Sequence, residues 1–142
     1  MVAILTVKNL SKSFGSLLVI DKFELSLEAG EALGIIGPNG AGKSTLFNLI
    51  TGGLPTVTGS IYFNGTDVTQ LPAHERCRSG IGRSYQIPHP FGGMTVFENL
   101  LVGAAFGGMR SESDSYQSCV DIVSLTGLKR KANTLAGSLT LL

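Results

Sequence analysis

The sequence predicts an α/β fold in which an antiparallel β region precedes a buried strand, a glycine-rich loop and a helix. Two observations carry this prediction. Apolar and polar residues alternate over residues 23–28, which is typical of a strand with one buried face. A continuous apolar run at 32–36 leads directly into the glycine-rich stretch 37–45, after which apolar residues recur at helical spacing.

Five segments have the composition of strands. "VAILTV" (2–7) and the alternating segment 23–28 lie near the N-terminus and predict an antiparallel sheet. "ALGII" (32–36) is apolar apart from one glycine and predicts a strand that is buried on both faces. "GSIYFNG" (59–65) is bounded by glycines and ends in an Asn-Gly turn signal, and "GIGRSYQ" (80–86) predicts a further strand.

Apolar spacing and capping signals predict four helices. Thr95 and Glu98 have the spacing of a capping box, in which each side chain satisfies a free backbone donor at a helix start. In the last helix, Tyr116, Val120 and Val123 are expected to share one face. The four helices are expected at 43–51, at 72–78, from about Val96, and at about 113–125.

Composition and charge argue against several classes of protein. The formal net charge is +1, so no global field favours nucleic acid, and the basic run at 129–131 is interpreted as a solvated surface. The N-terminus lacks the basic leader of a signal peptide, and no apolar run is long enough to span a bilayer. Cys77 and Cys119 are far apart in the sequence and are expected to be free thiols in a reducing compartment.

The stretch "GPNGAGKST" (37–45) carries the clearest functional signal. It satisfies the P-loop pattern, whose glycines let consecutive backbone N–H groups turn toward a phosphate. The lysine then meets the β- and γ-phosphates, the serine hydroxyl lies on Mg²⁺, and the helix start adds its positive dipole end. A dinucleotide-binding loop is rejected, because the glycines do not fall in its pattern and the lysine has no role in it. The defining positions are Gly37, Gly42, Lys43 and Ser44.

Two histidines offer weaker signals. His74 and Cys77, in "HERCR", form a single pair with no second pair at matching spacing, so a zinc site is not predicted. His89 lies between prolines without an accompanying nucleophile, so no catalytic role is assigned to it.

The residues of the P-loop and of two further stretches resemble the ATP-binding cassette (ABC) family, the ATPase subunits of ABC transporters. "NLSKSFG" (9–15) is similar to that family's A-loop region, in which an aromatic residue, here Phe14, lies against the adenine ring. The alternative is that Phe14 is a core aromatic. Gln86, in "GIGRSYQIPHPF", falls where the family carries its Q-loop glutamine, which the resemblance makes a ligand of Mg²⁺ or its water and a link to the transmembrane partner. The following "PFGGMTVFENLLVG" resembles especially the cassettes that serve branched-chain amino acids.

The resemblance implies a P-loop NTPase fold of the ABC ATPase type, with a β subdomain and P-loop core at 1–92 and a partial helical subdomain at 93–142. It implies a subunit that couples ATP binding and hydrolysis to solute import, with branched-chain amino acids as the expected solute. The expected partners are transmembrane permease subunits and a second ATPase subunit, without nucleic acid, and the expected location is cytoplasmic, on the inner face of the plasma membrane. The expected ATP ligands are Phe14, Gly37, Pro38, Asn39, Gly40, Ala41, Gly42, Lys43, Ser44 and Thr45, and the expected Mg²⁺ ligands are Ser44 and Gln86.

The resemblance covers only the N-terminal portion of an ABC cassette. Leu139 and Thr140 stand where the family's signature loop begins, but Leu141 replaces the first glycine of its Leu-Ser-Gly-Gly-Gln pattern. The Walker B aspartate, catalytic glutamate, D-loop and switch histidine of the family have no counterpart in these 142 residues. No catalytic residue is therefore assigned, and the chain alone is predicted not to hydrolyse ATP at a transporter's rate. Two alternatives stay open: a stand-alone module that binds nucleotide without hydrolysing it, and a fragment without function.

Overall fold

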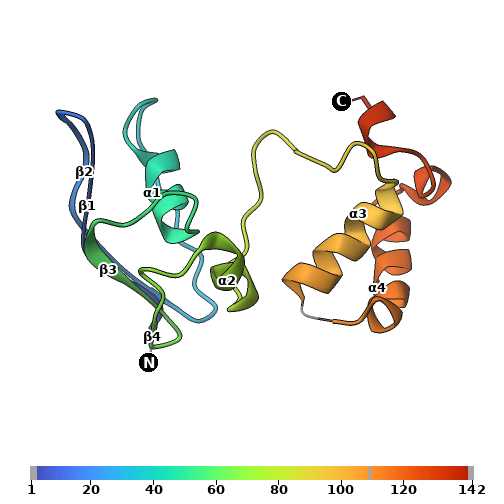
Figure 1. Ribbon diagram of the computed structural model, residues 1–142, viewed down its shortest axis with the longest axis horizontal. Coiled ribbons are helices and arrows are strands. Elements are labelled where there is room, and N and C mark those ends of the chain that lie inside the picture. The colour runs from blue at the N-terminus through green and yellow to red at the C-terminus, as the bar shows by residue number, and fades with distance from the viewer. Residues whose placement is uncertain (1–2, 109, 141–142) are drawn as a thin grey trace. The chain divides into compact units, whose positions relative to one another are not determined.

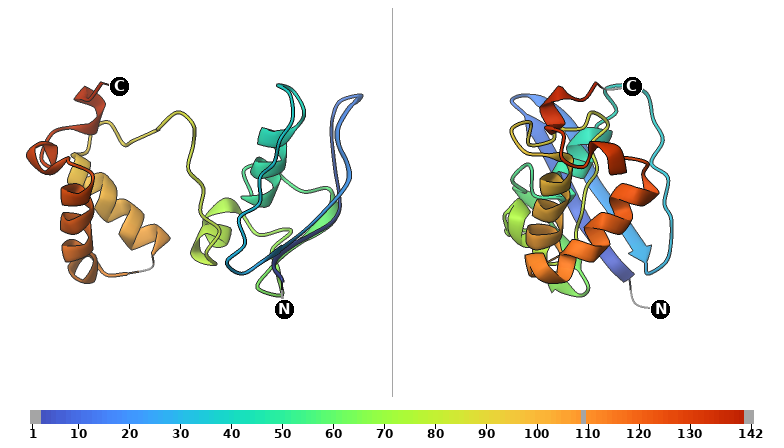
Figure 2. Two further views of the ribbon diagram at one scale, coloured as in Figure 1. Left: turned by 180° about the vertical axis from the view of Figure 1, so that it is seen from behind. Right: turned by 90° about the vertical axis from the view of Figure 1, so that its right-hand side faces the viewer.

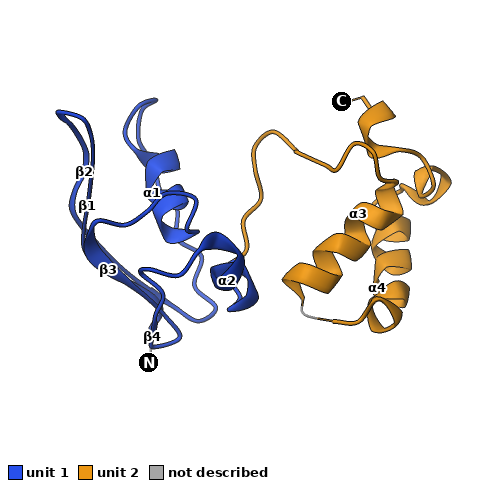
Figure 3. Cartoon of the chain, in the orientation of Figure 1, with its two compact units in different colours: residues 1–81 blue, residues 82–142 orange. Residues whose placement is uncertain are grey.

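The computed structural model describes residues 3–108 and 110–140 (Figure 1, Figure 2). The chain forms two compact units, residues 1–81 and 82–142 (Figure 3). The division predicted from the sequence, after residue 92, falls inside the second unit. The glycine-rich loop therefore belongs to unit 1, whereas Gln86 belongs to unit 2.

Unit 1 is built on a four-stranded antiparallel sheet with the strand order β2-β1-β3-β4 (Figure 1). The alternating segment lies in the second strand, and the Asn-Gly signal forms the turn between the last two strands, so both predictions are confirmed. The strands are β1 (Ala3–Phe14), β2 (Leu17–Glu28), β3 (Thr58–Phe63) and β4 (Thr66–Asp67).

Helix α1 (Lys43–Ile50) lies beside this sheet and shares its core (Figure 2). Leu46, Leu49 and Ile50 of α1 are buried in this core because they recur at spacings of three and four residues along the helix, whereas Phe47 is 44% exposed. The predicted helix at 43–51 is thereby confirmed to within one residue at its end. The fully or nearly fully buried core consists of Val7, Leu10, Ile20, Leu46, Leu49, Ile50, Ile61 and Val68.

Two predicted strands, at 32–36 and 80–86, are wrong. Neither segment is a strand, and the described strands β1 to β4 pair only with one another. An apolar run becomes a buried strand only where neighbouring strands satisfy its backbone groups and cover its side chains. In the described part of the chain no strand pairs with 32–36. Ile35 packs against the core, but Leu33 is 49% exposed and Ile36 is 97% exposed.

Helix α2 (Ala73–Arg78) ends unit 1 and confirms the helix predicted at 72–78. Its N-cap is Pro72, which supplies no side-chain hydrogen bond to the first turn. The short helix is held by Arg76 instead, which is buried among backbone carbonyls of α1 and of the segment before α2.

Unit 2 contains two packed helices, α3 (Val96–Val102) and α4 (Glu112–Leu125), as predicted. Helix α3 continues into a π-helical turn, η1 (Gly103–Gly107), and two short 3₁₀ turns follow α4, η2 (Lys129–Lys131) and η3 (Ala136–Ser138). The basic run predicted to be solvated forms η2 and is exposed.

The buried face of α4 differs from the predicted one. Ser115, Cys119 and Val123 are buried at a spacing of four residues, whereas Tyr116 is 57% exposed. Tyr116 instead packs edge-on against Phe97 of α3, with ring centroids 4.9 Å apart. Helix geometry explains the difference, because residues four apart lie on one face and a residue one position away lies about a quarter turn to the side.

The start of α3 confirms the predicted capping box. The Thr95 hydroxyl oxygen accepts the backbone N–H of Glu98 at 3.2 Å, and a Glu98 carboxylate oxygen accepts the backbone N–H of Thr95 at 2.7 Å. The same carboxylate also accepts the Thr95 hydroxyl proton at 2.9 Å. These bonds from Thr95, the backbone N–H first, hold the pKa of the Glu98 carboxyl below its ordinary value.

Acid is therefore expected to loosen unit 2 through Glu98. The pKa of Glu98 is lower in the folded chain than in the unfolded chain. The stability that the ionised Glu98 carboxylate adds is therefore complete above its ordinary pKa of 4.5, and it is lost as the pH falls through the lower folded pKa. Glu98→Gln should remove this part of the acid sensitivity when melting of the helices is followed by circular dichroism from neutral to acidic pH. Glu112→Gln, in the first turn of α4, is the control. Equal acid sensitivity in the wild type and in Glu98→Gln would contradict the assignment.

Candidate nucleotide-binding site

The end of the glycine-rich loop packs directly against strand β2. Gly42 is the N-cap of α1 and has φ 84°, a left-handed conformation that side-chain-bearing residues rarely adopt. A Cβ atom at this position would lie 3.0 Å from Cδ1 of Ile20 and 3.1 Å from the carbonyl oxygen of Val19. Glycine is thus required twice over, for the backbone turn and for the approach to β2.

Lys43 is the first residue of α1, and the loop before it folds around its ammonium group. The Nζ atom of Lys43 donates to the carbonyl oxygens of Gly37 at 2.5 Å and Pro38 at 2.7 Å. The N–H of Ala41 also donates to the Pro38 carbonyl, at 3.2 Å, which closes the loop. The loop therefore holds a half-buried positive charge among neutral acceptors. An anionic phosphate oxygen is a stronger acceptor for an ammonium group than a carbonyl is.

The N-terminal end of α1 is open to an anion. Gly42 supplies no side-chain cap, and the first turn contains no acidic residue. The first helical hydrogen bond runs from the N–H of Leu46 to the carbonyl of Gly42 at 2.9 Å. The N–H groups before it have no partner within the helix, and the helix dipole is positive at this end. Phosphate is the ligand that this arrangement suits.

Ser44 and Thr45 follow the lysine in the first turn of α1. Ser44 is exposed and Thr45 is half-buried. Mg²⁺ in nucleotide sites takes one or two protein oxygens together with phosphate oxygens and water. An exposed hydroxyl beside a phosphate-binding helix start fits that requirement, so Ser44 is suited to hold the ion.

Phe14 ends β1 in the same unit as the loop. Its side chain is 46% exposed, which does not fit the alternative of a core aromatic. It pairs across the hairpin with Leu17, which is 66% exposed, and Nζ of Lys12 lies 5.6 Å from the ring centroid. The end of this hairpin offers an apolar surface on which a purine ring can stack. The contact of Phe14 with adenine stays a prediction.

Gln86 lies in unit 2, in an exposed segment between α2 and α3. The structure therefore does not bring Gln86 together with Ser44 within one compact unit, and the role of Gln86 as a second Mg²⁺ ligand stays a prediction.

His89 lies close to Tyr85 of the same segment, with ring centroids 6.0 Å apart in an edge-on arrangement.

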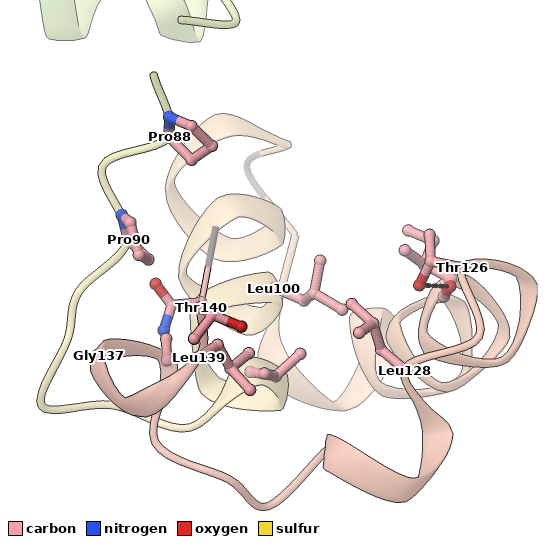
Figure 4. A pocket seen from close by; sticks show the side chains of 12 residues that line it. Pro88, Pro90, Leu100, Thr126, Leu128, Gly137, Leu139 and Thr140 are labelled. Carbon is pink, nitrogen blue, oxygen red and sulfur yellow. Dashed lines mark hydrogen bonds between the residues drawn. The ribbon is translucent and has the colours of Figure 1, made fainter. Parts of the chain in front are cut away.

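The start of the predicted signature loop borders a cavity of unit 2 with a volume of about 620 Å³. Figure 4 shows Leu139 and Thr140 at its wall, with Leu100 of α3 and Leu128 after α4. Leu141, the predicted departure from the signature pattern, lies outside the described residues.

Sequence reasoning missed Arg76, although it singled out two neighbours in the same stretch. Its side chain is 1% exposed, and its guanidinium donates to four backbone carbonyls at 2.6–2.9 Å. Burial lowers the pKa of Arg76, and the charge of Asp67 partly opposes that shift. An arginine in a short helix ordinarily reads as a surface residue, so spacing alone gives no signal for this role.

The described residues contain neither a group of metal-ligating side chains nor a candidate membrane span. Within residues 3–108 and 110–140, no three His, Cys, Asp or Glu side chains are grouped so that they could hold a metal ion. Both cysteines are free thiols, as predicted, with Cys119 buried and Cys77 half-buried. In the same described ranges, no helix combines the length and apolar character that crossing a bilayer requires.

Residues 20–140 match the protein family described as "ABC transporter". The chain is 42% identical over 107 residues to the "Probable branched-chain amino acid transport ATP-binding protein LivG" of Archaeoglobus fulgidus, a match that covers 75% of this chain and 42% of that protein. It is 39% identical over 99 residues to the "Lipopolysaccharide export system ATP-binding protein LptB" of Escherichia coli K12, covering 70% and 41%.

A solved structure has the same fold. The ADP conformation of an ATP-binding cassette of an ABC transporter matches with a TM-score of 0.80 and 34% identity, covering 99% of this chain and 60% of that one. The chain spans about two fifths of the length of the curated relatives it matches. The predicted α/β fold of the P-loop NTPase type is confirmed. Because the family match extends over most of its residues, this chain belongs to the ABC transporter family.

Proposed function

We propose that the loop 37–45 binds the phosphates of ATP together with Mg²⁺. The observation that carries this proposal is the Lys43 ammonium group, which the loop holds at the uncapped start of α1. An anion at this place gains a charge-assisted hydrogen bond, free backbone donors and the helix dipole at once. Relatives of the chain are named as ATP-binding proteins, and one solved cassette is in an ADP conformation, which supports the same ligand.

The whole protein is proposed to be the ATPase subunit of an ABC importer. In this proposal two ATPase subunits bind transmembrane permease subunits at the inner face of the plasma membrane and couple ATP hydrolysis to transport. Branched-chain amino acids are the proposed solute, because the archaeal relative that carries this name matches over more residues than the lipopolysaccharide export protein does.

Lys43→Ala is expected to weaken the binding of Mg·ATP. The substitution removes a charge-assisted hydrogen bond of about 1.5–3 kcal/mol, which corresponds to roughly a tenfold or greater rise in Kd. Titration calorimetry on the folded proteins measures the change. Lys8→Ala, an exposed lysine on β1 of the same unit, is the control and should bind as the wild type does. Equal affinities in wild type and Lys43→Ala would reject the loop as the phosphate site.

Ser44→Ala is expected to weaken ATP binding only when Mg²⁺ is present, because its hydroxyl is proposed to hold the ion rather than a phosphate. Gln86→Ala should behave in the same way if the family's Q-loop role applies to it. The measurement compares ATP affinities with Mg²⁺ and with a chelator. Ser118→Ala, an exposed serine of α4, is the control. A loss of affinity that is the same with and without Mg²⁺ would assign Ser44 to the phosphates instead.

A further inference from the structure

A side chain of α2 bonds the C-terminal end of helix α1, in addition to the N–H of Gly52 in the following turn, which donates to the Leu49 carbonyl at 3.3 Å. Nη1 of Arg76 donates to the carbonyl oxygens of Leu49 at 2.6 Å and Ile50 at 2.9 Å, the last two residues of the helix. Carbonyl groups at a helix end lack partners within the helix and lie at the negative end of its dipole. A cation that donates to two of these carbonyls gives them hydrogen-bond partners and also places a favourable charge at the negative end of the dipole. Arg76 of α2 therefore caps the C-terminal end of α1.

The remaining donors of the same guanidinium tie the helix end to the sheet. Nε of Arg76 donates to the carbonyl of Leu71 at 2.8 Å, and Nη2 donates to the carbonyl of Thr69 at 2.7 Å. The Thr69 hydroxyl oxygen in turn accepts the backbone N–H of Ile61, in β3, at 2.8 Å. One planar group thus fixes α1 relative to the central part of the sheet.

The turn after α1 is shaped for this contact. Gly52 has φ +78°, and a Cβ atom there would lie 2.9 Å from the backbone nitrogen of Ala73 and 3.2 Å from Nε of Arg76. Helix α2 therefore packs directly on the turn, with no room for a side chain between them. This close packing of α2 on the turn at Gly52 is a second observation, apart from the hydrogen bonds, that places Arg76 at the end of α1.

Helix α1 needs such a constraint because it is short. Its eight residues make about two turns, roughly 12 Å, and a helix of this length is not stable by itself. The apolar contacts of Leu46, Leu49 and Ile50 bury the helix, but apolar contact is not directional. The hydrogen bonds of Arg76 are directional and fix where the helix lies along its own axis.

We propose that Arg76 is a positioning residue for the phosphate site: by holding the C-terminal end of α1 it keeps Lys43 and Ser44 where the nucleotide phosphates bind. This inference rests on the proposed binding of Mg·ATP by the loop. Arg76 does not contact the nucleotide in this account and acts only through the helix. Its loss lowers affinity because a loop and helix that are no longer preorganised must be ordered on binding.

Titration of Mg·ATP into the full chain tests this inference with three variants. Arg76→Met keeps a long side chain but removes every donor, and Kd is expected to rise about tenfold. Arg76→Lys keeps the charge but loses the planar fork, so a smaller rise is expected. Val7→Ala, in the buried core on β1, is the control for lost stability and should keep its Kd within about threefold of the wild type. All titrations are made at a temperature where each protein is folded.

The outcomes separate positioning from stability. A rise of less than about threefold in Arg76→Met, or an equal rise in Val7→Ala at an equal loss of melting temperature, overturns the inference. If Arg76→Met does not fold, Arg76→Lys decides, and a Kd equal to that of the wild type overturns the inference. If neither variant folds, Arg76 is required for folding and the positioning role is rejected.

A wild type that does not bind Mg·ATP would reject the proposed function, and the hold of Arg76 on α1 would then be tested by itself. Hydrogen exchange then decides the matter without nucleotide. The N–H of Leu46 donates to Gly42 at the end of α1 opposite Arg76. If this amide exchanges faster in Arg76→Met than in Val7→Ala at matched stability, Arg76 stabilises α1 as far as its N-terminal end. Equal exchange in the two variants overturns the inference.

Discussion

The positive charges at the two ends of helix α1 set the constraints on which unit 1 depends. A cation stabilises the C-terminal end of a helix and destabilises the N-terminal end, by about 0.3–1 kcal/mol at an exposed site. Arg76 occupies the favourable end, where it bonds two helix carbonyls. Lys43 occupies the unfavourable end and is compensated by carbonyls of its own loop. That end has the electrostatic character of a site that an anion completes.

One hairpin of the sheet positions both the phosphate loop and the surface proposed for the base. Val19 and Ile20 of β2 lie against Gly42, so the strand determines where the loop turns into α1. Phe14 lies at the other side of the same hairpin, paired with Leu17. A nucleotide bound between these features would therefore be held by one hairpin of the fold, and the sheet would serve function as well as stability.

The sequence predicted those features that depend on neighbouring residues. The helix start after the glycine-rich loop and the capping box of Thr95 and Glu98 depend on local patterns, and both appear where they were expected. The segment 32–36 was predicted wrongly because a buried strand is defined by its neighbours in the sheet, which an apolar run does not specify. The role of Arg76 was missed for a similar reason. Its acceptors include Leu49, 27 residues away, and no spacing rule connects the two.

A crystal structure of the 142-residue chain bound to Mg·ATP would show whether the loop 37–45 binds the nucleotide. We expect the triphosphate to lie in the loop, with Nζ of Lys43 moved from the carbonyl oxygens of Gly37 and Pro38 to a phosphate oxygen about 2.7–2.9 Å away. We also expect Mg²⁺ on the Ser44 hydroxyl. A nucleotide bound elsewhere, with Lys43 still bonded to its own loop, would show that the loop is not the phosphate site.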